Sequence, residues 1–196
     1  MEVDFSVELG RDDPTLEIPW SEPEGRLHYF NLKLQSSALV MIPEAAQFPE
    51  LRAFLVLLNS PGSPLESAKC DTWSTTELQP EEEIFGEPWK FAVYVDLLFT
   101  HSAKRDSFSH HEQYLKALTG LLRSEPEIAA SAEFILRRCF YHRDSEMREG
   151  FYFTAYVFGY GSDESHAQRN CSVALCNVSC AMLRGFPAPP GQKSAL

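Results

Sequence analysis

Residues 90–100, KFAVYVDLLFT, carry the clearest strand pattern in the chain, and the predicted fold is built outward from them. β-Branched and aromatic residues, which favour strands, fill almost the whole stretch. Its nearly continuous apolar character predicts a central strand that is covered on both faces. A single acid, Asp96, interrupts the stretch, and a charge at such a position must be paired or must face a wet surface.

The segments that follow this strand predict a compact supersecondary unit. Residues 110–127 have the spacing of an amphipathic helix, and 132–142 and 150–160 read as strands joined by the charged turn RDSEMREG. Residues 163–184 repeat apolar side chains at helical spacing. The order strand, helix, strand, strand, helix is that of a split βαβ, ferredoxin-like arrangement, with both helices on one face of an antiparallel sheet.

The N-terminal half adds further elements that would extend this sheet. The expected strands are 3–9, 26–34 and 68–78, the expected helix is 49–62, and 16–18 forms a short extended piece. The fold class is therefore α+β, in a single domain that spans residues 1–185. Residues 186–196, rich in Pro and Ala, are predicted to form a disordered tail.

The composition excludes several classes of partner. Of the 196 residues, 44% are hydrophobic, which supports a well-packed core, and the formal net charge is −11. A surface of that sign repels nucleic-acid phosphates and anionic membranes, so neither is an expected partner. The start of the chain is acidic, no apolar run approaches the roughly 18 residues of a membrane span, and the cysteine number is odd. These features predict a cytoplasmic protein.

A Gly-x-Gly pattern in FGYGSDESHAQRN, residues 158–170, resembles a phosphate-binding turn at first sight. A dinucleotide fingerprint needs a third glycine where this chain has Glu164, and Asp163 and Glu164 occupy the position of a phosphate at the helix start. We interpret the segment as a tight corner. Ser162 or Asp163 caps the helix, and Gly161 supplies a backbone angle that other residues resist.

Metal and cofactor sites lack a sequence signature. Cys171, Cys176 and Cys180 lie on one predicted helix without a C-x-x-C pair, and they are expected to pack in the core. The six histidines show no chelating spacing and are expected at the surface or at helix caps. Phosphate-loop and serine-nucleophile motifs are also missing. We therefore predict no metal and no cofactor.

Strand alternation places a set of polar and aromatic side chains on the sheet face that the helices leave uncovered. One of the two arginines at 137 and 138 belongs to this face, and the sequence does not decide which. His142 ends a strand and is expected at the rim of the sheet. The candidate site residues are Tyr94, Asp96, Arg137, Arg138, His142, Tyr152 and Tyr156, with Thr154 between the last two.

Two functions are compatible with this face. The first is a non-catalytic interaction or ligand-binding module with an acidic surface, whose partner is a basic protein or a second copy of the chain. The alternative is a small cofactor-independent enzyme that uses Asp96 as acid or base and Arg137 or Arg138 as an anion anchor. The enzyme requires Asp96 in a closed pocket near His142 or a tyrosine, whereas the module requires a broad, shallow face.

Overall fold

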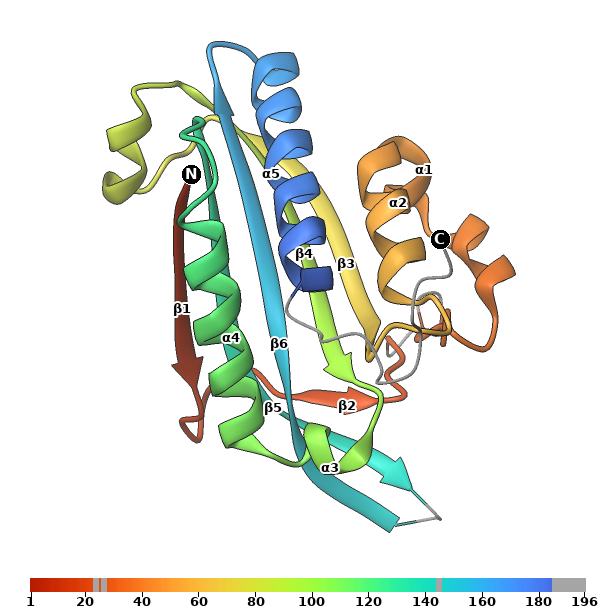
Figure 1. Cartoon of the computed structure of the whole chain (residues 1–196). Coiled ribbons are helices and arrows are strands. Elements are labelled where there is room, and N and C mark those ends of the chain that lie inside the picture. Colours follow the sequence, from red (N-terminus) through yellow and green to blue (C-terminus); the bar gives the residue numbers. More distant parts are fainter. Residues whose placement is uncertain (23–24, 26–27, 144–145, 185–196) are drawn as a thin grey trace, which may run out of the picture.

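A computed structural model gives a mixed α+β structure with one six-stranded sheet and helices packed against it (Figure 1). It describes residues 1–22, 25, 28–143 and 146–184. The predicted tail at 186–196 lies outside the described residues. The charged turn predicted between the last two strands is largely strand, because the hairpin continues to Arg143 and resumes at Glu146, with 144–145 also outside the description.

The strands run in the spatial order β1-β5-β6-β4-β3, and β2 continues the edge that β1 forms along β5. Their bounds are β1 (Glu2–Glu8), β2 (Leu16–Ile18), β3 (Leu65–Thr75), β4 (Trp89–Phe99), β5 (Ala130–Arg143) and β6 (Glu146–Gly161). β1 and β2 are parallel to β5, and the other neighbours are antiparallel. The prediction of an antiparallel sheet was therefore wrong at this edge. Hairpin reasoning fixes the direction of strands joined by short turns, and β1 is joined to β5 by most of the chain.

Two long helices lie side by side on one face of the sheet (Figure 1). The helices are η1 (Ser36–Met41), α1 (Pro43–Gln47), α2 (Pro49–Leu58), η2 (Pro80–Phe85), α3 (Ser102–Arg105), α4 (Phe108–Leu122) and α5 (Glu164–Arg184). α4 and α5 form the long pair, and α2 packs against α5 beside β3. Ser107 caps α4, because its hydroxyl accepts a hydrogen bond from the backbone N–H of His110 at 3.2 Å.

The alternation along β4 divides the interior into two clusters. Val93, Val95 and Leu97 point into the main core, where they meet the apolar stripes of α4 and α5. Leu98 belongs to a smaller cluster on the opposite face, which also contains Tyr152 and the two apolar residues of β2. The segment around β2 thus covers part of the face that α4 and α5 leave uncovered.

The prediction of a strand at 26–34 was wrong. In the described part, His28 forms an isolated bridge with Ser21, and residues 32–34 form a turn. Phe30 packs against the main core while Tyr29 packs against the smaller cluster. A segment that is wedged between two apolar clusters shows the same alternation of side chains as a strand, which explains the error.

The Gly-x-Gly segment is a corner, as its sequence predicts. Asp163 caps α5, because its carboxylate accepts a hydrogen bond from the N–H of His166 at 2.8 Å. The reason given for Gly161 was wrong, since the described residues with a positive φ are Gly25 and Gly86. A Cβ on Gly159 would lie 2.1 Å from the backbone nitrogen of Cys171, and one on Gly161 would lie 2.3 Å from that of Ala167. Both glycines therefore let α5 pack directly on the backbone of β6.

Candidate functional site

The strands β4, β5 and β6 bring most of the candidate residues onto the face opposite α4 and α5. Tyr94 lies directly across from Tyr156, and Asp96 lies across from Thr154. Arg137 joins them from β5. We call this surface the polar-aromatic face. It consists of Trp73, Tyr94, Asp96, Glu133, Arg137, Thr154, Tyr156 and Phe158, together with the bordering acid Asp71.

A chain of hydrogen bonds crosses four neighbouring strands on this face, β4, β6, β5 and β1. The Thr154 hydroxyl donates to Asp96 Oδ1 at 2.6 Å and accepts from Arg137 Nη1 at 2.9 Å. Arg137 Nε in turn donates to Glu8 Oε2 at 2.7 Å. Glu8 belongs to β1, where the parallel register places it beside Arg137. The guanidinium is therefore neutralised within the chain.

Asp96 is a buried acid with a perturbed pKa. The residue is 7% exposed, and burial raises the pKa of its carboxyl to about 6. The hydrogen bond from Thr154 and the charges of Lys69 and Arg137 offset part of this effect. Within the described part of the chain, Thr154 donates the hydrogen bond to Asp96, and no histidine or tyrosine does so.

Aromatic rings form a continuous stripe across the polar-aromatic face. The ring centroids of Trp73 and Tyr94 are 6.4 Å apart, those of Tyr94 and Tyr156 are 5.7 Å apart, and Tyr156 stacks on Phe158 at 6.0 Å. Trp73 is 36% exposed, and the other three rings are partly exposed. Trp73 and Phe158 were not among the residues predicted for this face. Extending the alternation of Thr154 and Tyr156 by two residues would have found Phe158.

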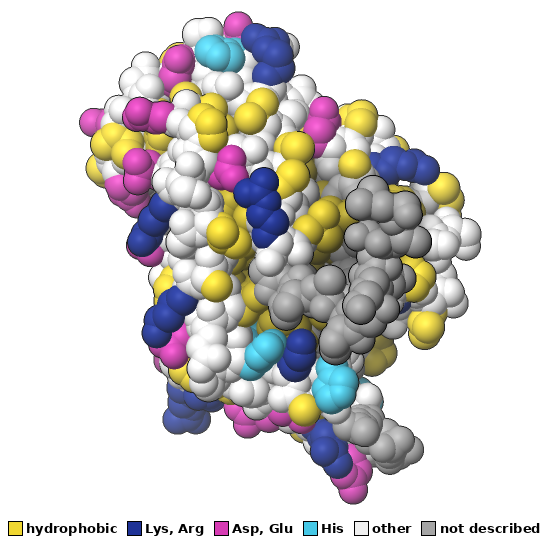
Figure 2. Space-filling view, in the orientation of Figure 1, with side chains coloured by type: hydrophobic (Ala, Val, Ile, Leu, Met, Phe, Trp, Pro, Cys, Tyr) yellow, Lys and Arg dark blue, Asp and Glu magenta, His cyan; other side chains and the backbone are white. Residues whose placement is uncertain are grey.

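Acidic side chains border the aromatic stripe. Asp71 lies across from Tyr94, and Glu133 lies across from Tyr156. Burial raises the pKa of Glu133, and the neighbouring carboxylates Glu8 and Asp4 raise it further. Figure 2, which views the molecule from the side of α4 and α5, shows further acidic side chains over the end that carries η2. Asp71 and Glu133 thus place two carboxyl groups beside the aromatic stripe.

The remaining candidate residues do not belong to the exposed part of this face. Tyr152 shares the phase of Thr154, but it is 3% exposed and belongs to the smaller apolar cluster. Arg138 lies on the opposite face from Arg137 by strand alternation, and its Nε is 3.6 Å from a carboxylate oxygen of Glu149. His142 lies at the far end of β5, where its Nε2 is 3.6 Å from Glu17 Oε1. The structure brings together the central residues of the predicted site, keeps Tyr152 as a buried neighbour of Arg137, and separates Arg138 and His142 from the site.

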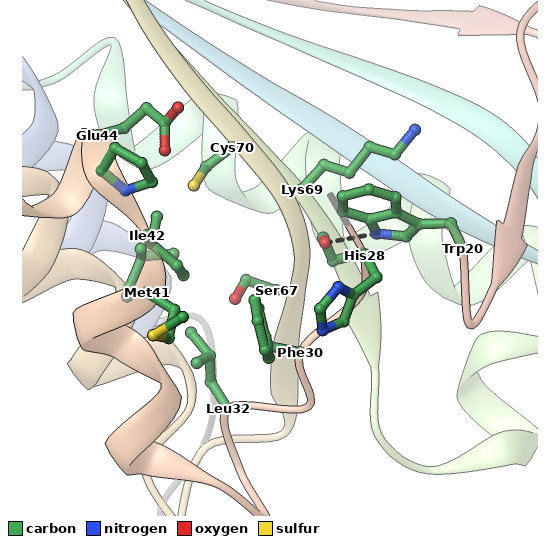
Figure 3. Close-up of a pocket in the computed structure, with 13 residues that line it drawn as sticks. Trp20, His28, Phe30, Leu32, Met41, Ile42, Glu44, Ser67, Lys69 and Cys70 are labelled. Atoms are coloured by element: carbon green, nitrogen blue, oxygen red, sulfur yellow. Dashed lines mark hydrogen bonds between the residues drawn. The ribbon is translucent and has the colours of Figure 1, made fainter. Parts of the chain in front are cut away.

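A cavity of about 180 Å³ lies beside β3, and the sequence analysis did not anticipate it (Figure 3). Its walls come from Trp20, from residues 28–32, from η1 and α1, and from α2 and β3. Several of these residues belong to the segment wrongly predicted as a strand. A wider depression of about 430 Å³ adjoins it and reaches Tyr94 on the polar-aromatic face.

Among the described residues, no group of three or more His, Cys, Asp or Glu side chains could hold a metal ion. Cys171 is buried as expected, whereas Cys176 and Cys180 are exposed, contrary to the prediction of core packing. His111, expected at the surface, is completely buried against Phe99 and Phe151. No described helix combines the length and apolar character that crossing a membrane requires.

Comparison of the chain with protein-family models finds no match, and comparisons with curated proteins and with solved structures find no significant similarity. The fold and the polar-aromatic face are thus the grounds on which a function can be argued. Together they define a mixed α+β protein with a polar-aromatic sheet face.

Proposed function

We propose that the chain is a non-catalytic binding module whose polar-aromatic face holds a positively charged segment of a partner protein. The observation that carries this proposal is the partly exposed aromatic stripe bordered by Asp71 and Glu133. Arginine and lysine side chains bind the faces of aromatic rings, and the neighbouring carboxylates strengthen this attraction. A net charge of −11 also accelerates the approach of a basic partner.

The proposal also covers the finer fold, the cellular compartment and the kind of partner. β4 and β5 run parallel on either side of β6, and α4 connects them, which supports the split βαβ, ferredoxin-like arrangement with helices mainly on one face. The five cysteines are free, as suits a soluble protein of the reducing cytoplasm. The acidic surface disfavours nucleic acid as a partner. A second copy of the chain stays the alternative partner, and light scattering on the purified protein distinguishes a dimer from a monomer.

The alternative of a small enzyme has one supporting observation, the raised pKa of Asp96. Catalysis near neutral pH benefits from an acid of this kind. An anion anchor has less support, because Arg137 is paired with Glu8 and Arg138 lies on the other face. Asp96 itself is turned toward Thr154. The binding module is therefore the better supported function.

The test uses an eight-residue peptide of alternating Arg and Gly as the cationic probe, with affinity measured by calorimetry at low salt. Replacing two rings in the variant Trp73→Leu/Tyr156→Leu leaves the net charge unchanged. We expect binding to weaken about tenfold, because each exposed cation–π contact contributes on the order of 0.5–1 kcal/mol.

A pair of charge variants separates a specific site from general attraction to an acidic protein. Asp71→Asn/Glu133→Gln removes two acids beside the stripe, and Glu50→Gln/Glu112→Gln removes two acids from α2 and α4 on the other face. The first pair should weaken binding several-fold more than the second. Equal losses in both pairs, or full affinity without the two rings, would show that the face is not the site.

A further inference from the structure

We infer that the cavity beside β3 binds a small amphiphilic cation, an aromatic or short aliphatic group that carries a primary ammonium. The inference concerns a site different from the polar-aromatic face, and it stands whether or not a basic partner binds there. It rests on the size of the cavity, on its apolar walls and on one carboxylate at its mouth.

The interior of the cavity is apolar. Phe30, Leu32, Ile42 and Leu55 line it from the segments that surround β3, and Ala68 contributes from the strand itself (Figure 3). Its volume of about 180 Å³ exceeds the roughly 150 Å³ of an engineered apolar cavity that takes up benzene. A group the size of a phenyl ring therefore fits, and its burial supplies the hydrophobic part of the affinity.

The mouth of the cavity carries a negative charge that no side chain of the described residues neutralises. In Figure 3 the carboxylate of Glu44 is directed toward Cys70, and it makes no hydrogen bond or ion pair with the side chains that the structure describes. Lys69, the nearest cation in the wall, extends away from the cavity, with its Nζ 4.7 Å from the centre of the Trp20 ring. The Trp20 indole is in turn fixed by a 2.8 Å hydrogen bond to the carbonyl oxygen of Ala68.

The thiol of Cys70 further limits the kind of ligand that the cavity can bind. Burial raises its pKa to about 12, and the carboxylates of Glu44 and Asp71 contribute to the rise. The thiol therefore stays protonated and neutral at physiological pH, so it does not compensate the charge of a cation or attack a ligand. The adjoining depression adds Glu22 and Asp71 to the approach. Anions are disfavoured at this mouth, while an ammonium group would form an ion pair with Glu44.

The experiment measures three ligands of nearly equal shape by calorimetry: 2-phenylethylamine, 2-phenylethanol and 3-phenylpropionate. We expect the amine to bind with a dissociation constant of about 1 mM or lower, roughly tenfold more tightly than the alcohol, and the carboxylate to bind least. Glu44→Gln should reduce the amine to the affinity of the alcohol. Glu50→Gln, which removes an exposed acid of α2 and changes the net charge equally, should leave the preference intact.

A filling variant tests the cavity itself. Ile42→Trp should abolish binding of both amine and alcohol, and Met41→Trp, at an exposed position of the rim, serves if the first variant fails to fold. A phenylalanyl-glycine amide distinguishes a free amine from a peptide N-terminus as the natural source of the ammonium. Three results would each overturn the inference. They are a folded wild type that does not bind the amine, a wild type that binds the carboxylate as tightly as the amine, and equal effects of Glu44→Gln and Glu50→Gln on amine binding.

Discussion

Replacing Asp96 by Asn should stabilise the protein at neutral pH, although it removes a member of a hydrogen-bonded chain. Burial raises the pKa of Asp96 from 3.8 to about 6. Between these values the folded protein binds more protons than the unfolded chain, so stability falls as the pH rises through this window. A difference of about two pH units corresponds to a cost of about 3 kcal/mol at pH 7 for keeping the carboxyl ionised.

Asparagine has nearly the same shape and cannot ionise. Its Oδ1 can accept the hydrogen bond that Thr154 donates at 2.6 Å to Asp96. The attraction of Lys69 and Arg137 for the carboxylate would be lost, but burial outweighs that attraction in the wild type. We therefore expect a gain of about 1–3 kcal/mol in the free energy of unfolding at pH 7. The gain should vanish near pH 4, where Asp96 is protonated.

The assay is urea unfolding of wild type and Asp96→Asn at pH 4, 5, 6 and 7, with circular dichroism as the probe. Asp71→Asn is the matched control, since Asp71 is an exposed acid on the neighbouring strand and should leave stability nearly unchanged. The reasoning is refuted if Asp96→Asn is less stable than the wild type at pH 7. It is also refuted if the difference between them does not grow with pH, because an ion pair that stabilises the fold would then be the better description.

Two further predictions concern packing and acid stability. Gly159→Ala should destabilise the protein by several kcal/mol, because its Cβ would lie 2.1 Å from the backbone nitrogen of Cys171. Gly120→Ala, in α4 with open space around it, should stabilise the protein by about 0.5–1 kcal/mol. Thermal unfolding of both variants and the wild type measures the two effects. Burial lowers the pKa of His111 to about 4, so stability falls as the pH drops from 6.5 toward 4. His111→Phe should reduce this fall in the free energy of unfolding by up to about 3 kcal/mol. If urea unfolding shows the same fall with pH in the variant as in the wild type, His111 is not its cause.

The face of each side chain along a strand was predictable from sequence, because the alternation is local. It placed Tyr94 and Asp96 with Thr154 and Tyr156, and cross-strand pairing agrees. The choice between the two arginines was not predictable. The phase of one strand relative to another depends on the register of the sheet, and here that register also involves β1, whose Glu8 is 129 residues away from Arg137 in the sequence.

The cavity beside β3 was beyond sequence reasoning for a different reason. Its walls are formed by turns and short helices whose side chains follow no periodic pattern. Phe30 and Leu32 alternate with polar residues, which predicted a strand, although Leu32 is buried in the main core and Phe30 packs against it. Periodicity reports that a side chain is buried, and it does not report which neighbour buries it.

The parallel edge strand β1, which was wrongly predicted to be antiparallel, also determines the electrostatics of the site. Because β1 runs parallel to β5, Glu8 lies beside Arg137 and pairs with it at 2.7 Å. The side chain that the enzyme hypothesis needs as an anion anchor is thereby neutralised, while Glu133 and Asp71 stay at the border of the aromatic stripe. An anionic substrate would have to displace Glu8 and approach these acids. A cationic segment meets neither obstacle, and the proposal of a basic partner rests on this difference.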